Sequence, residues 1–436
     1  MKPLLRLSRR AGRTAENPIG YLMHQAVANP DLISLAAGLV DQESLPADET
    51  LATLTELLSD RDAARRALQY GTTQGHERLR ELVVERLERL EGCLAREMGV
   101  DAGHVVITTG SQQFLQLISD VLFDPGDIVL MGSPDYFVYM GVLTGLGVRV
   151  IGVPLDEHGI VTEALDETLD HLDRAGQLER VKLVYCCSYS QNPSGVTLAP
   201  ERRTRILDIV RKWSRFGRIF LLEDAAYREL YYSAQAPRSI RSFDSRGETV
   251  ILTQTFSKPY SPGLKIGYSV LPDDLLGPVL REKGNHDFGS ANFNQHLLAR
   301  VMESGRYEEH VAKLREIYRA KLRAMLHSLE QEFSRLDVEA QWTRPAGGLY
   351  VWLTLPESMD TGRSGQLFQR CLEKSVLYVP GEYCFPGERL DHGPCPLGGP
   401  SHTMRLSFGV QPVDGIREGI ARLAAAVAQC REQVVV

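Results

Sequence analysis

The segment TFSKPYSPGLKIGY, residues 255–268, carries two lysines, Lys258 and Lys265, seven residues apart among hydroxyl side chains. A lysine near another cation loses its proton more readily, and its free amine can attack a carbonyl. Thr255 and Ser257 supply hydroxyls beside it. These residues predict that Lys258 carries a carbonyl-bearing cofactor covalently, and that its neighbours hold the phosphate of that cofactor.

Side chains that could bind a cofactor also follow other short apolar runs. In the turn Gly110-Ser111-Gln112, free N–H groups ahead of a periodic helix suit a phosphate, although glycine often serves such turns for steric reasons alone. Tyr136 could stack on a flat heterocycle, although a half-buried core tyrosine is the commoner case. Asn192 lies in the tight turn QNPSG, where its side chain can also donate to a ring oxygen.

Asp224 and Tyr227 follow another apolar run, three residues apart, and would project to one side if a helical turn begins there. A carboxylate buried at a sheet end needs a partner, because an isolated charge in an apolar setting is unfavourable. A cationic ring nitrogen would be such a partner. Each residue alone has an ordinary structural explanation, but together these chain segments supply the groups that bind a pyridine aldehyde phosphate.

These side chains need a scaffold that brings them together. Between about residues 100 and 275, short β-branched runs alternate with longer amphipathic stretches, which is the pattern of a parallel sheet wrapped by helices. Ligands of such sheets bind beyond the carboxyl ends of the strands. The near-continuous apolar character predicts burial on both faces. The expected strands are 105–109, 128–131, 148–153, 181–187, 219–223, 250–254 and 265–271.

The pattern changes after residue 300. Apolar residues recur three and four apart from 307 to 333 and predict a long amphipathic helix. Short strands are expected at 348–353 and 405–408, a closing helix at 413–429, and a long Gly/Pro-rich loop at 381–400. We therefore expect an N-terminal arm and part of a small domain in residues 1–48, a large cofactor-binding domain in 49–300, and a small C-terminal domain in 301–436.

Composition narrows the possible partners. With 436 residues, 43% hydrophobic and 24% charged, the chain is typical of globular proteins. No apolar run approaches the roughly 18 residues that a bilayer requires, so no membrane association is expected. The formal net charge of -7 argues against a nucleic-acid partner. Small-molecule substrates are expected instead.

Cysteine and histidine usage bears on location and metals. Seven cysteines without a C-x-x-C pair fit a reduced cytosol, so a cytoplasmic location is predicted. Eleven histidines show no metal-ligand spacing, and no metal is expected. The basic first fifteen residues resemble a transit peptide, or equally an arm that docks on a partner subunit. Charged faces at 61–66 and 77–91 are expected to be solvated.

Over nearly its whole length the chain resembles a fold type I, pyridoxal-phosphate (PLP)-dependent aminotransferase of class I/II, in the branch of kynurenine and 2-aminoadipate aminotransferases. The motifs that carry the resemblance are LAAG at 35–38, LQYG at 68–71, NPSG at 192–195, DAAY at 224–227, SK at 257–258 and RLSF at 405–408, with ANFNQ at 291–295 indicating the branch. The resemblance implies an α/β fold, with a three-layer α/β/α large domain around a mostly parallel seven-stranded sheet and a smaller α+β domain.

The resemblance also implies roles around the PLP ring. Lys258 would form the internal aldimine and, once freed, would move the proton between Cα and C4′. Asp224 would pair with the protonated pyridine nitrogen and keep the ring an electron sink. Asn192 and Tyr227 would hydrogen-bond the phenolic oxygen of the ring and favour its anion. Tyr136 would stack on the ring.

Further implied roles concern the phosphate and the substrate. The groups that would hold the phosphate are the backbone of Ser111 and Gln112 with the side chains of Thr255, Ser257 and Lys265. Tyr70 would reach the phosphate in the neighbouring subunit, so that activity requires a homodimer. Arg405 would clamp the substrate α-carboxylate with its two-point fork, assisted by Gly38 and Asn192.

Two departures from the family pattern stand out. Lys265 occupies the place of a usual arginine, and it binds phosphate as a point charge without bidentate geometry. The residues before Arg405, HTM at 402–404, lack the asparagine often found there. We expect weaker cofactor binding from the first departure and altered carboxylate recognition from the second.

The expected reaction is transfer of an amino group from an L-amino acid to a 2-oxo acid, 2-oxoglutarate being the expected acceptor, by a ping-pong mechanism. Another fold type I PLP enzyme, a lyase, decarboxylase or synthase, is the alternative, because the outcome depends on which Cα bond lies perpendicular to the ring. A PLP-sensing regulator would need a DNA-binding module of about 60–100 residues. Only about thirty residues precede the motif at 35–38.

Overall fold

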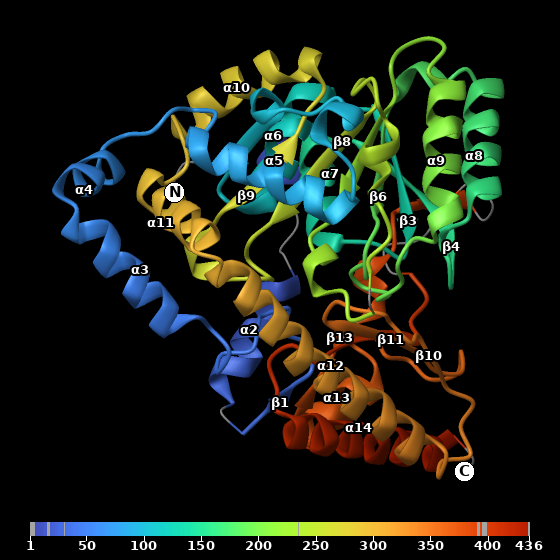
Figure 1. The fold of residues 1–436 in the computed structure, drawn as a ribbon. Coiled ribbons are helices and arrows are strands. Elements are labelled where there is room, and N and C mark those ends of the chain that lie inside the picture. The colour runs from blue at the N-terminus through green and yellow to red at the C-terminus, as the bar shows by residue number, and fades with distance from the viewer. Residues whose placement is uncertain are drawn as a thin grey trace.

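The structure of the chain is a computed structural model that describes residues 5–14, 18–29, 31–233, 235–389, 393–394 and 399–434. A large unit is built around a ten-stranded sheet, and a smaller unit around a four-stranded sheet lies below it in Figure 1. The two units meet at the end of the large sheet where β6 and β3 point down toward the small sheet.

The large sheet has the strand order β15-β14-β4-β3-β6-β7-β8-β9-β2, and β5 (Gly159–Ile160) pairs with β4. Pairs from β4 through β8 are parallel, whereas β9 is antiparallel to both of its neighbours. The seven main strands are β2 (Val105–Thr108), β3 (Ile128–Ser133), β4 (Arg149–Asp156), β6 (Val181–Cys187), β7 (Phe220–Asp224), β8 (Val250–Thr255) and β9 (Gly267–Val270). This arrangement confirms the predicted α/β fold class.

Helices cover both faces of this sheet, because successive strand residues point to opposite faces and both sets are apolar. On one face, α6 (Gly110–Leu122) and α7 (Phe137–Leu146) pack on side chains such as Val129 and Leu222. On the other face lie α8 (Thr162–Arg174) and α9 (Pro200–Trp213), with α5 (Glu77–Glu91) and α11 (Asn292–Glu303) farther along. Helix α10 (Asp273–Asp287) lies beside α6 (Figure 1).

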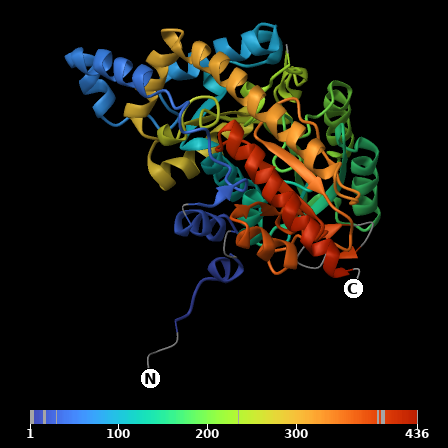
Figure 2. The ribbon, with the colours of Figure 1, turned by 90° about the horizontal axis from the view of Figure 1, so that it is seen from below.

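The small unit packs helices on one antiparallel sheet. The long predicted helix is α12 (Arg306–Phe333), and the closing helix is α14 (Val413–Val434); the two lie side by side in Figure 2. Helix α13 (Gln366–Glu373) packs on α14. The sheet has the order β10 (Gln341–Trp342), β11 (Tyr350–Thr354), β16 (Thr403–Ser407) and β13 (Val379–Pro380).

The N-terminal segment contributes to both units. Strand β1 (Ile33–Ser34) pairs in parallel with β12 (Val376–Leu377) of the small unit. Helix α1 (Arg9–Arg13) packs on α7, where Arg13 donates to the carbonyl of Gly145. Helices α2 (Pro18–Ala28), α3 (Ala47–Ser59) and α4 (Arg61–Leu68) follow, and α3 and α4 project from the flank of the molecule in Figure 1. The domain limits at residues 48 and 300 stay predictions.

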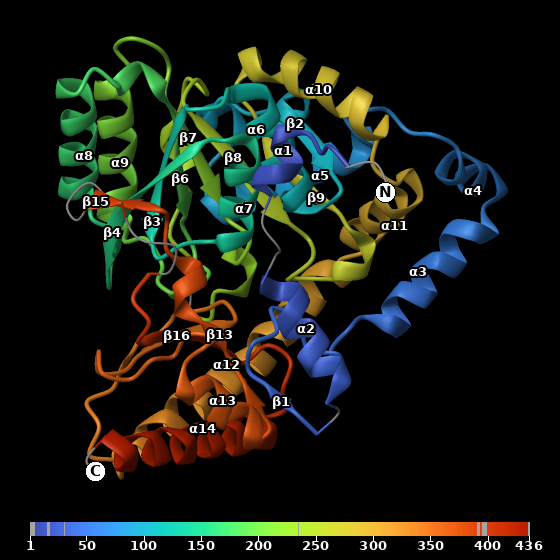
Figure 3. The same ribbon diagram turned by 180° about the vertical axis from the view of Figure 1, so that it is seen from behind.

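Two expectations about element limits are wrong. The loop predicted at 381–400 contains the short helix η7 (Gly381–Cys384) and a hairpin of β14 (Glu388–Arg389) and β15 (Gly393–Pro394). Strand β14 pairs in parallel with β4, and Figure 3 shows β15 at this outer edge of the large sheet. A salt bridge of 2.8 Å between Arg149 and Glu388 supports that pairing, and no local periodicity reveals so distant a contact.

The strand predicted at 265–271 begins only at Gly267. Lys265 has a left-handed backbone with φ of 53° and caps the short helix η6 (Pro262–Leu264). A residue in that conformation cannot continue a strand. Lys265 therefore lies in the turn that leads into the strand.

Three general expectations can be compared with the described residues. No helix in that part of the chain is long and apolar enough to cross a bilayer. The cysteines within the described ranges are all free thiols, and no cluster of three or more metal-ligating side chains occurs there.

The remaining short helices are η1 (Ala95–Met98), η2 (Ala102–His104), η3 (Leu178–Arg180), η4 (Arg228–Leu230) and η5 (Ile240–Phe243).

Candidate active site

A cavity of about 260 Å³ opens at the carboxyl ends of β6, β7 and β8, between the large sheet and the small unit. The sequence-predicted residues that line it are Gly38, Ser111, Gln112, Tyr136, Asn192, Asp224, Tyr227, Thr255, Ser257, Lys258, Lys265 and Arg405. The lining is completed by Thr109, Gly110, Tyr185, Cys187, Ala226, Pro262 and Tyr350. Residues separated by hundreds of positions therefore share one space, as the rule for parallel sheets predicts.

Lys258 follows β8 and is half-buried at the cavity. Its Nζ donates to the carbonyl oxygen of Gly38 at 2.6 Å. Burial is the largest cause that lowers the pKa of Lys258; Tyr350 opposes this shift, and the cations Arg405 and Lys265 add to it. The amine is therefore more readily deprotonated than an exposed lysine, which a nucleophile requires.

Asp224 ends β7 and is buried at the cavity wall. The Tyr185 hydroxyl donates to Oδ2 at 2.8 Å, and the N–H of Ala226 donates to Oδ1 at 3.1 Å. Among the described residues no cationic side chain pairs with this carboxylate. Burial raises the pKa of Asp224 to about 6. A cation bound in the cavity, such as a protonated pyridine nitrogen, would complete the site.

Tyr185 was not among the residues expected from the sequence. It lies within β6, and its side chain points to the same face as Cys187, which pairs with Asp224 in the sheet. The two-residue alternation along this strand is the signal that could have identified both cavity residues. Burial raises the pKa of Tyr185, so its hydroxyl stays protonated and donates to Asp224.

Tyr227 reaches the cavity without the helical turn that was considered for it. Strand β7 ends at Asp224, and the short helix η4 begins only after Tyr227. The Tyr227 hydroxyl donates to the hydroxyl of Tyr350 at 3.0 Å. Burial raises the pKa of Tyr227 well above its usual range, and the neutral phenol can donate a hydrogen bond. The sequence did not reveal Tyr350, because the side of the sheet on which its side chain lies depends on the register of β11 and β16.

The first turn of α6 forms one wall of the cavity. The helix begins at Gly110, whose φ of +72° favours glycine, and the residues of its first turn, Ser111 and Gln112, line the space. At Gly267 an added Cβ would lie 2.6 Å from the backbone nitrogen of Ser111, so glycine lets β9 approach the helix end. Unpaired N–H groups at a helix start bind phosphate well.

Hydroxyl and cationic side chains adjoin this helix start. The Thr255 hydroxyl donates to that of Ser257 at 2.9 Å, and exposed Lys265 lines the same space. Tyr136 precedes α7, is half-buried, and donates to Gln112 at 3.3 Å. This set of donors and one lysine suits a phosphate dianion, with an aromatic ring beside it.

Arg405 on β16 is only 2% exposed. Its Nη1 donates to Oδ1 of Asn192 at 2.8 Å and its Nη2 to the carbonyl of Ala36 at 2.7 Å. The Nε has no hydrogen-bond partner among the described residues. A buried guanidinium without a carboxylate partner is unfavourable by itself, so the arrangement favours binding of an anion.

The segment 35–41 closes one side of the cavity, with Gly38 in its lining. It carries the carbonyls that accept from Lys258 and Arg405. Its end is fixed by a buried ion pair, in which Lys321 on α12 donates to Asp41 at 2.6 Å and to the carbonyl of Gly409 at 3.2 Å.

Tyr70 does not line this cavity. It is 83% exposed and packs edge-on against Phe288, with ring centroids 5.6 Å apart. Its predicted contact with the phosphate in a neighbouring subunit stays a prediction.

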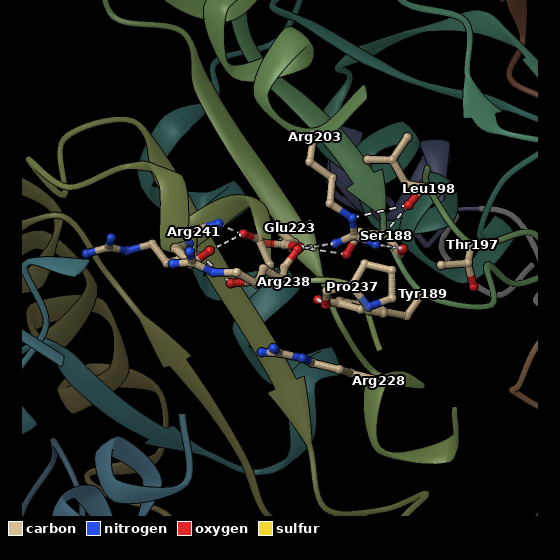
Figure 4. A network of polar contacts seen from close by, with 12 residues as sticks. Ser188, Tyr189, Thr197, Leu198, Arg203, Glu223, Arg228, Pro237, Arg238 and Arg241 are labelled. Carbon is tan, nitrogen blue, oxygen red and sulfur yellow. Dashed lines mark hydrogen bonds and ion pairs between the residues drawn. The ribbon is translucent and has the colours of Figure 1, made fainter. Parts of the chain in front are cut away.

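A second cluster of charge lies on the opposite face of β7 (Figure 4). Glu223 is fully buried, accepts from the Ser188 hydroxyl at 2.7 Å and from the N–H of Arg241 at 2.9 Å, and lies 3.5 Å from Arg203. Arg203 also donates to the carbonyl of Ser188 and stacks on Tyr189, 4.4 Å from its ring centroid. The charges and hydrogen bonds of these groups are satisfied within the cluster. None of them lines the cavity at Lys258.

The cavity residues fit PLP. Asp224, a carboxylate without a cationic partner among the described residues, would suit the ring nitrogen. The helix start with its hydroxyls and lysine would suit the phosphate, and Lys258, an amine of lowered pKa, would suit the aldehyde. Arg405 lines the same cavity and would offer its guanidinium to a carboxylate.

Comparisons with known proteins agree with this chemistry. The family model "Aminotransferase class I and II" matches residues 30–390. An aromatic-amino-acid aminotransferase of Thermococcus litoralis is 35% identical over 92% of this chain and 89% of its own length. A 2-aminoadipate transaminase of Thermus thermophilus is 33% identical over 98% of both chains. The crystal structure of Pyrococcus horikoshii kynurenine aminotransferase aligns with a TM-score of 0.86, at 32% identity, over 98% of this chain and 97% of its own.

Fold, cavity and relatives lead to one conclusion. The chain belongs to the class I and II aminotransferases, as a fold type I, PLP-dependent enzyme of the branch with the aromatic-amino-acid, 2-aminoadipate and kynurenine aminotransferases.

Proposed function

We propose that the enzyme transfers the amino group of an L-amino acid to a 2-oxo acid, with 2-oxoglutarate as acceptor, in two half-reactions at one site. One observation carries the proposal: the buried Arg405, with an unpaired Nε, lines the same cavity as Lys258. A carboxylate bound to Arg405 would hold the Cα of an amino acid beside the lysine amine. Both substrates of a transaminase carry such a carboxylate.

Each cavity residue has a role in this proposal. PLP, when bound, supplies an electron sink for the charge that develops at Cα. Lys258 holds PLP covalently, and its amine, once displaced by the substrate, moves the proton from Cα. Asp224 keeps the ring nitrogen protonated, and Tyr227 with Asn192 donates to the ring oxygen. Tyr136 stacks on the ring.

The phosphate anchor and the substrate clamp complete the proposal. Ser111 and Gln112 offer backbone N–H groups to the phosphate, and Thr255, Ser257 and Lys265 offer side chains. Arg405 binds the substrate carboxylate, while Asn192 and the backbone at Gly38 orient it. Asn192 already accepts from Arg405 at 2.8 Å, which fixes the plane of the guanidinium.

We further propose a homodimer that shares its active sites. Tyr70 is exposed, and exposed leucines lie nearby on α3 and α4, at Leu51, Leu58 and Leu68. A projecting pair of helices with exposed apolar side chains is typical of a protein–protein interface. In such a dimer Tyr70 would reach the phosphate in the neighbouring subunit. The cytoplasmic location stays a prediction.

The reaction class is tested by mixing the PLP-loaded enzyme with one amino acid at a time and no acceptor. Transamination releases one equivalent of 2-oxo acid per active site and then stops until 2-oxoglutarate is added. Continuous release of product without an acceptor, or loss of carbon dioxide, would instead identify the lyase or decarboxylase alternative.

Replacement of Lys258 with alanine should abolish covalent attachment of PLP and lower turnover by about 10⁴-fold, the upper range for loss of a proton-transfer group. Borohydride reduction followed by peptide mass spectrometry reads the attachment. The matched control is Lys265→Ala, which should keep the covalent link but release PLP more readily on dialysis. Attachment of PLP to a lysine other than Lys258 would contradict the proposal.

A further inference from the structure

Tyr350 on β11 lies between two proposed parts of the active site. It is 2% exposed, and its hydroxyl is 3.0 Å from that of Tyr227, with the two rings edge-on at 78°. The guanidinium carbon of Arg405 lies 4.2 Å from the centroid of the Tyr350 ring. One side chain thus contacts both the proposed partner of the PLP ring oxygen and the proposed carboxylate clamp.

The Tyr350 hydroxyl also lies against the segment that closes the cavity. A Cβ added at Gly38 would be 2.8 Å from this oxygen, and the carbonyl of Gly38 accepts from Lys258. The hydroxyl is therefore fixed on one side by backbone and on the other by Tyr227. Such a position leaves little freedom for its hydrogen bonds.

The number of protons decides the direction of the hydrogen bond. Each hydroxyl has one proton to donate. In the structure Tyr227 donates to Tyr350 at 3.0 Å. Once Tyr227 gives its proton to the PLP ring oxygen instead, this contact can persist only if its direction reverses and Tyr350 donates to the Tyr227 oxygen. A hydroxyl that accepts a hydrogen bond becomes a better donor, because neighbouring bonds polarise one another.

We propose that Tyr350 is a positioning residue that strengthens the hydrogen bond from Tyr227 to PLP and supports the plane of Arg405. This inference rests on the proposed role of Tyr227 in the aminotransferase site. A stronger donor to the ring oxygen favours its anion, and so the covalent link to PLP loses its proton at lower pH. Tyr350 therefore helps to set the pH at which the enzyme is ready for substrate.

The test is a pH titration of the visible absorption band of the PLP-loaded enzyme. Tyr350→Phe should raise the midpoint by about 0.5 pH unit, the scale expected for one cooperative neutral hydrogen bond. Tyr227→Phe should raise it further. In the double variant the midpoint should equal that of Tyr227→Phe alone, because Tyr350 acts through Tyr227.

A matched control is Tyr378→Phe, which removes a buried hydroxyl that donates to the carbonyl of Thr361 in the small unit. Its midpoint should equal that of the native enzyme. An unchanged midpoint in Tyr350→Phe, or additive shifts in the double variant, would overturn the inference. Absence of any PLP band in the native enzyme would instead refute the proposed function.

The second part of the inference concerns Arg405. Tyr350→Leu removes both the hydroxyl and the ring face, so it should raise the KM for the amino acid several-fold more than Tyr350→Phe does. Thermal melting of the loaded variants shows whether each is folded. Equal KM values in the two folded variants would show that the ring does not support Arg405.

Discussion

Two consecutive carboxylates at the end of β7 have opposite surroundings. Glu223 lies among Arg203, Ser188 and the backbone of Arg241, and these groups satisfy its charge within the protein. Asp224 points to the other face, and in the part of the chain that the structure describes its partners are a tyrosine hydroxyl and one backbone N–H. Both side chains are at most 4% exposed, so burial does not distinguish them.

The two carboxylates differ in whether the protein supplies a cationic partner. A buried carboxylate that the protein neutralises by itself contributes to stability and to the geometry of the loop around it. A buried carboxylate with neutral partners, beside a cavity, is unfavourable until a cation arrives. The comparison teaches that an incomplete set of partners indicates a ligand-binding role better than burial does.

Of the effects that test this comparison, the largest is expected in the activity of variants of the two acids. Asp224→Asn should lower kcat/KM by about 10³-fold, in the range known for loss of a charge that stabilises the transition state, because the amide cannot keep the PLP ring nitrogen protonated. Steady-state kinetics with one amino acid measures the effect. Glu223→Gln is the control and should retain activity below its unfolding temperature. Equal losses in both variants would remove the distinction.

In the second prediction, which concerns the free energy of unfolding, Glu223 matters more than Asp224. Glu223→Gln should lower the free energy of unfolding by about 3 kcal/mol, because Arg203 is left buried with weaker compensation. Urea denaturation of the PLP-free protein measures this value. Asp224→Asn should cause no such loss at neutral pH. A stable Glu223→Gln variant would show that the carbonyls around Arg203 are sufficient.

The third prediction concerns pH in the PLP-free protein. The folded-state pKa of Asp224, about 6, lies above the ordinary value of about 3.9, so the folded form binds this proton more tightly than the unfolded chain does. Its contribution to stability is complete below pH 4 and is lost as the pH rises through 6. Asp224→Asn should therefore gain about 1–3 kcal/mol relative to the native protein between pH 4.5 and 7.5, measured by urea denaturation at each pH. A difference that is constant with pH would contradict the unpaired state of Asp224.

The smallest expected effect sharpens the role of the partners of Asp224. Tyr185→Phe removes the donor to Oδ2, which raises the pKa of Asp224 further and should lower kcat about 5-fold, as for loss of one hydrogen bond. The acid limb of the pH–rate profile should move to higher pH. Tyr139→Phe is the matched control, since this buried hydroxyl forms its hydrogen bond with Ser119.

The large sheet and the cofactor site were accessible from the sequence because both depend on local patterns. Apolar runs predicted every main strand to within a few residues, and the groups after them meet at one cavity. Lys258, Asp224 and Arg405 could be named because their motifs occur in a fixed order. Tyr185 and Tyr350 were not predicted, because their roles depend on which face of a strand lies at the cavity.

Pairings between distant segments could not be predicted. The hairpin at 388–394 joins the large sheet through Arg149, more than two hundred residues earlier. Within 77–91, expected to be solvated, Arg86 and Glu91 are buried in ion pairs with Glu229 and Arg228. A charged residue shows its partner only after the chain has folded, and residue type alone favours the surface.

The closing segment at 35–41 presents backbone oxygens to both cations of the cavity. The carbonyl of Gly38 accepts from Lys258, and that of Ala36 accepts from Arg405. The position of this segment therefore helps to set the direction in which each cation points, and a bound aldehyde or carboxylate must share the cation with these oxygens or replace them. Discrimination among amino acids will follow from how well each displaces or tolerates these oxygens, so changes near Asp41 and Lys321, remote from the chemistry, should retune selectivity.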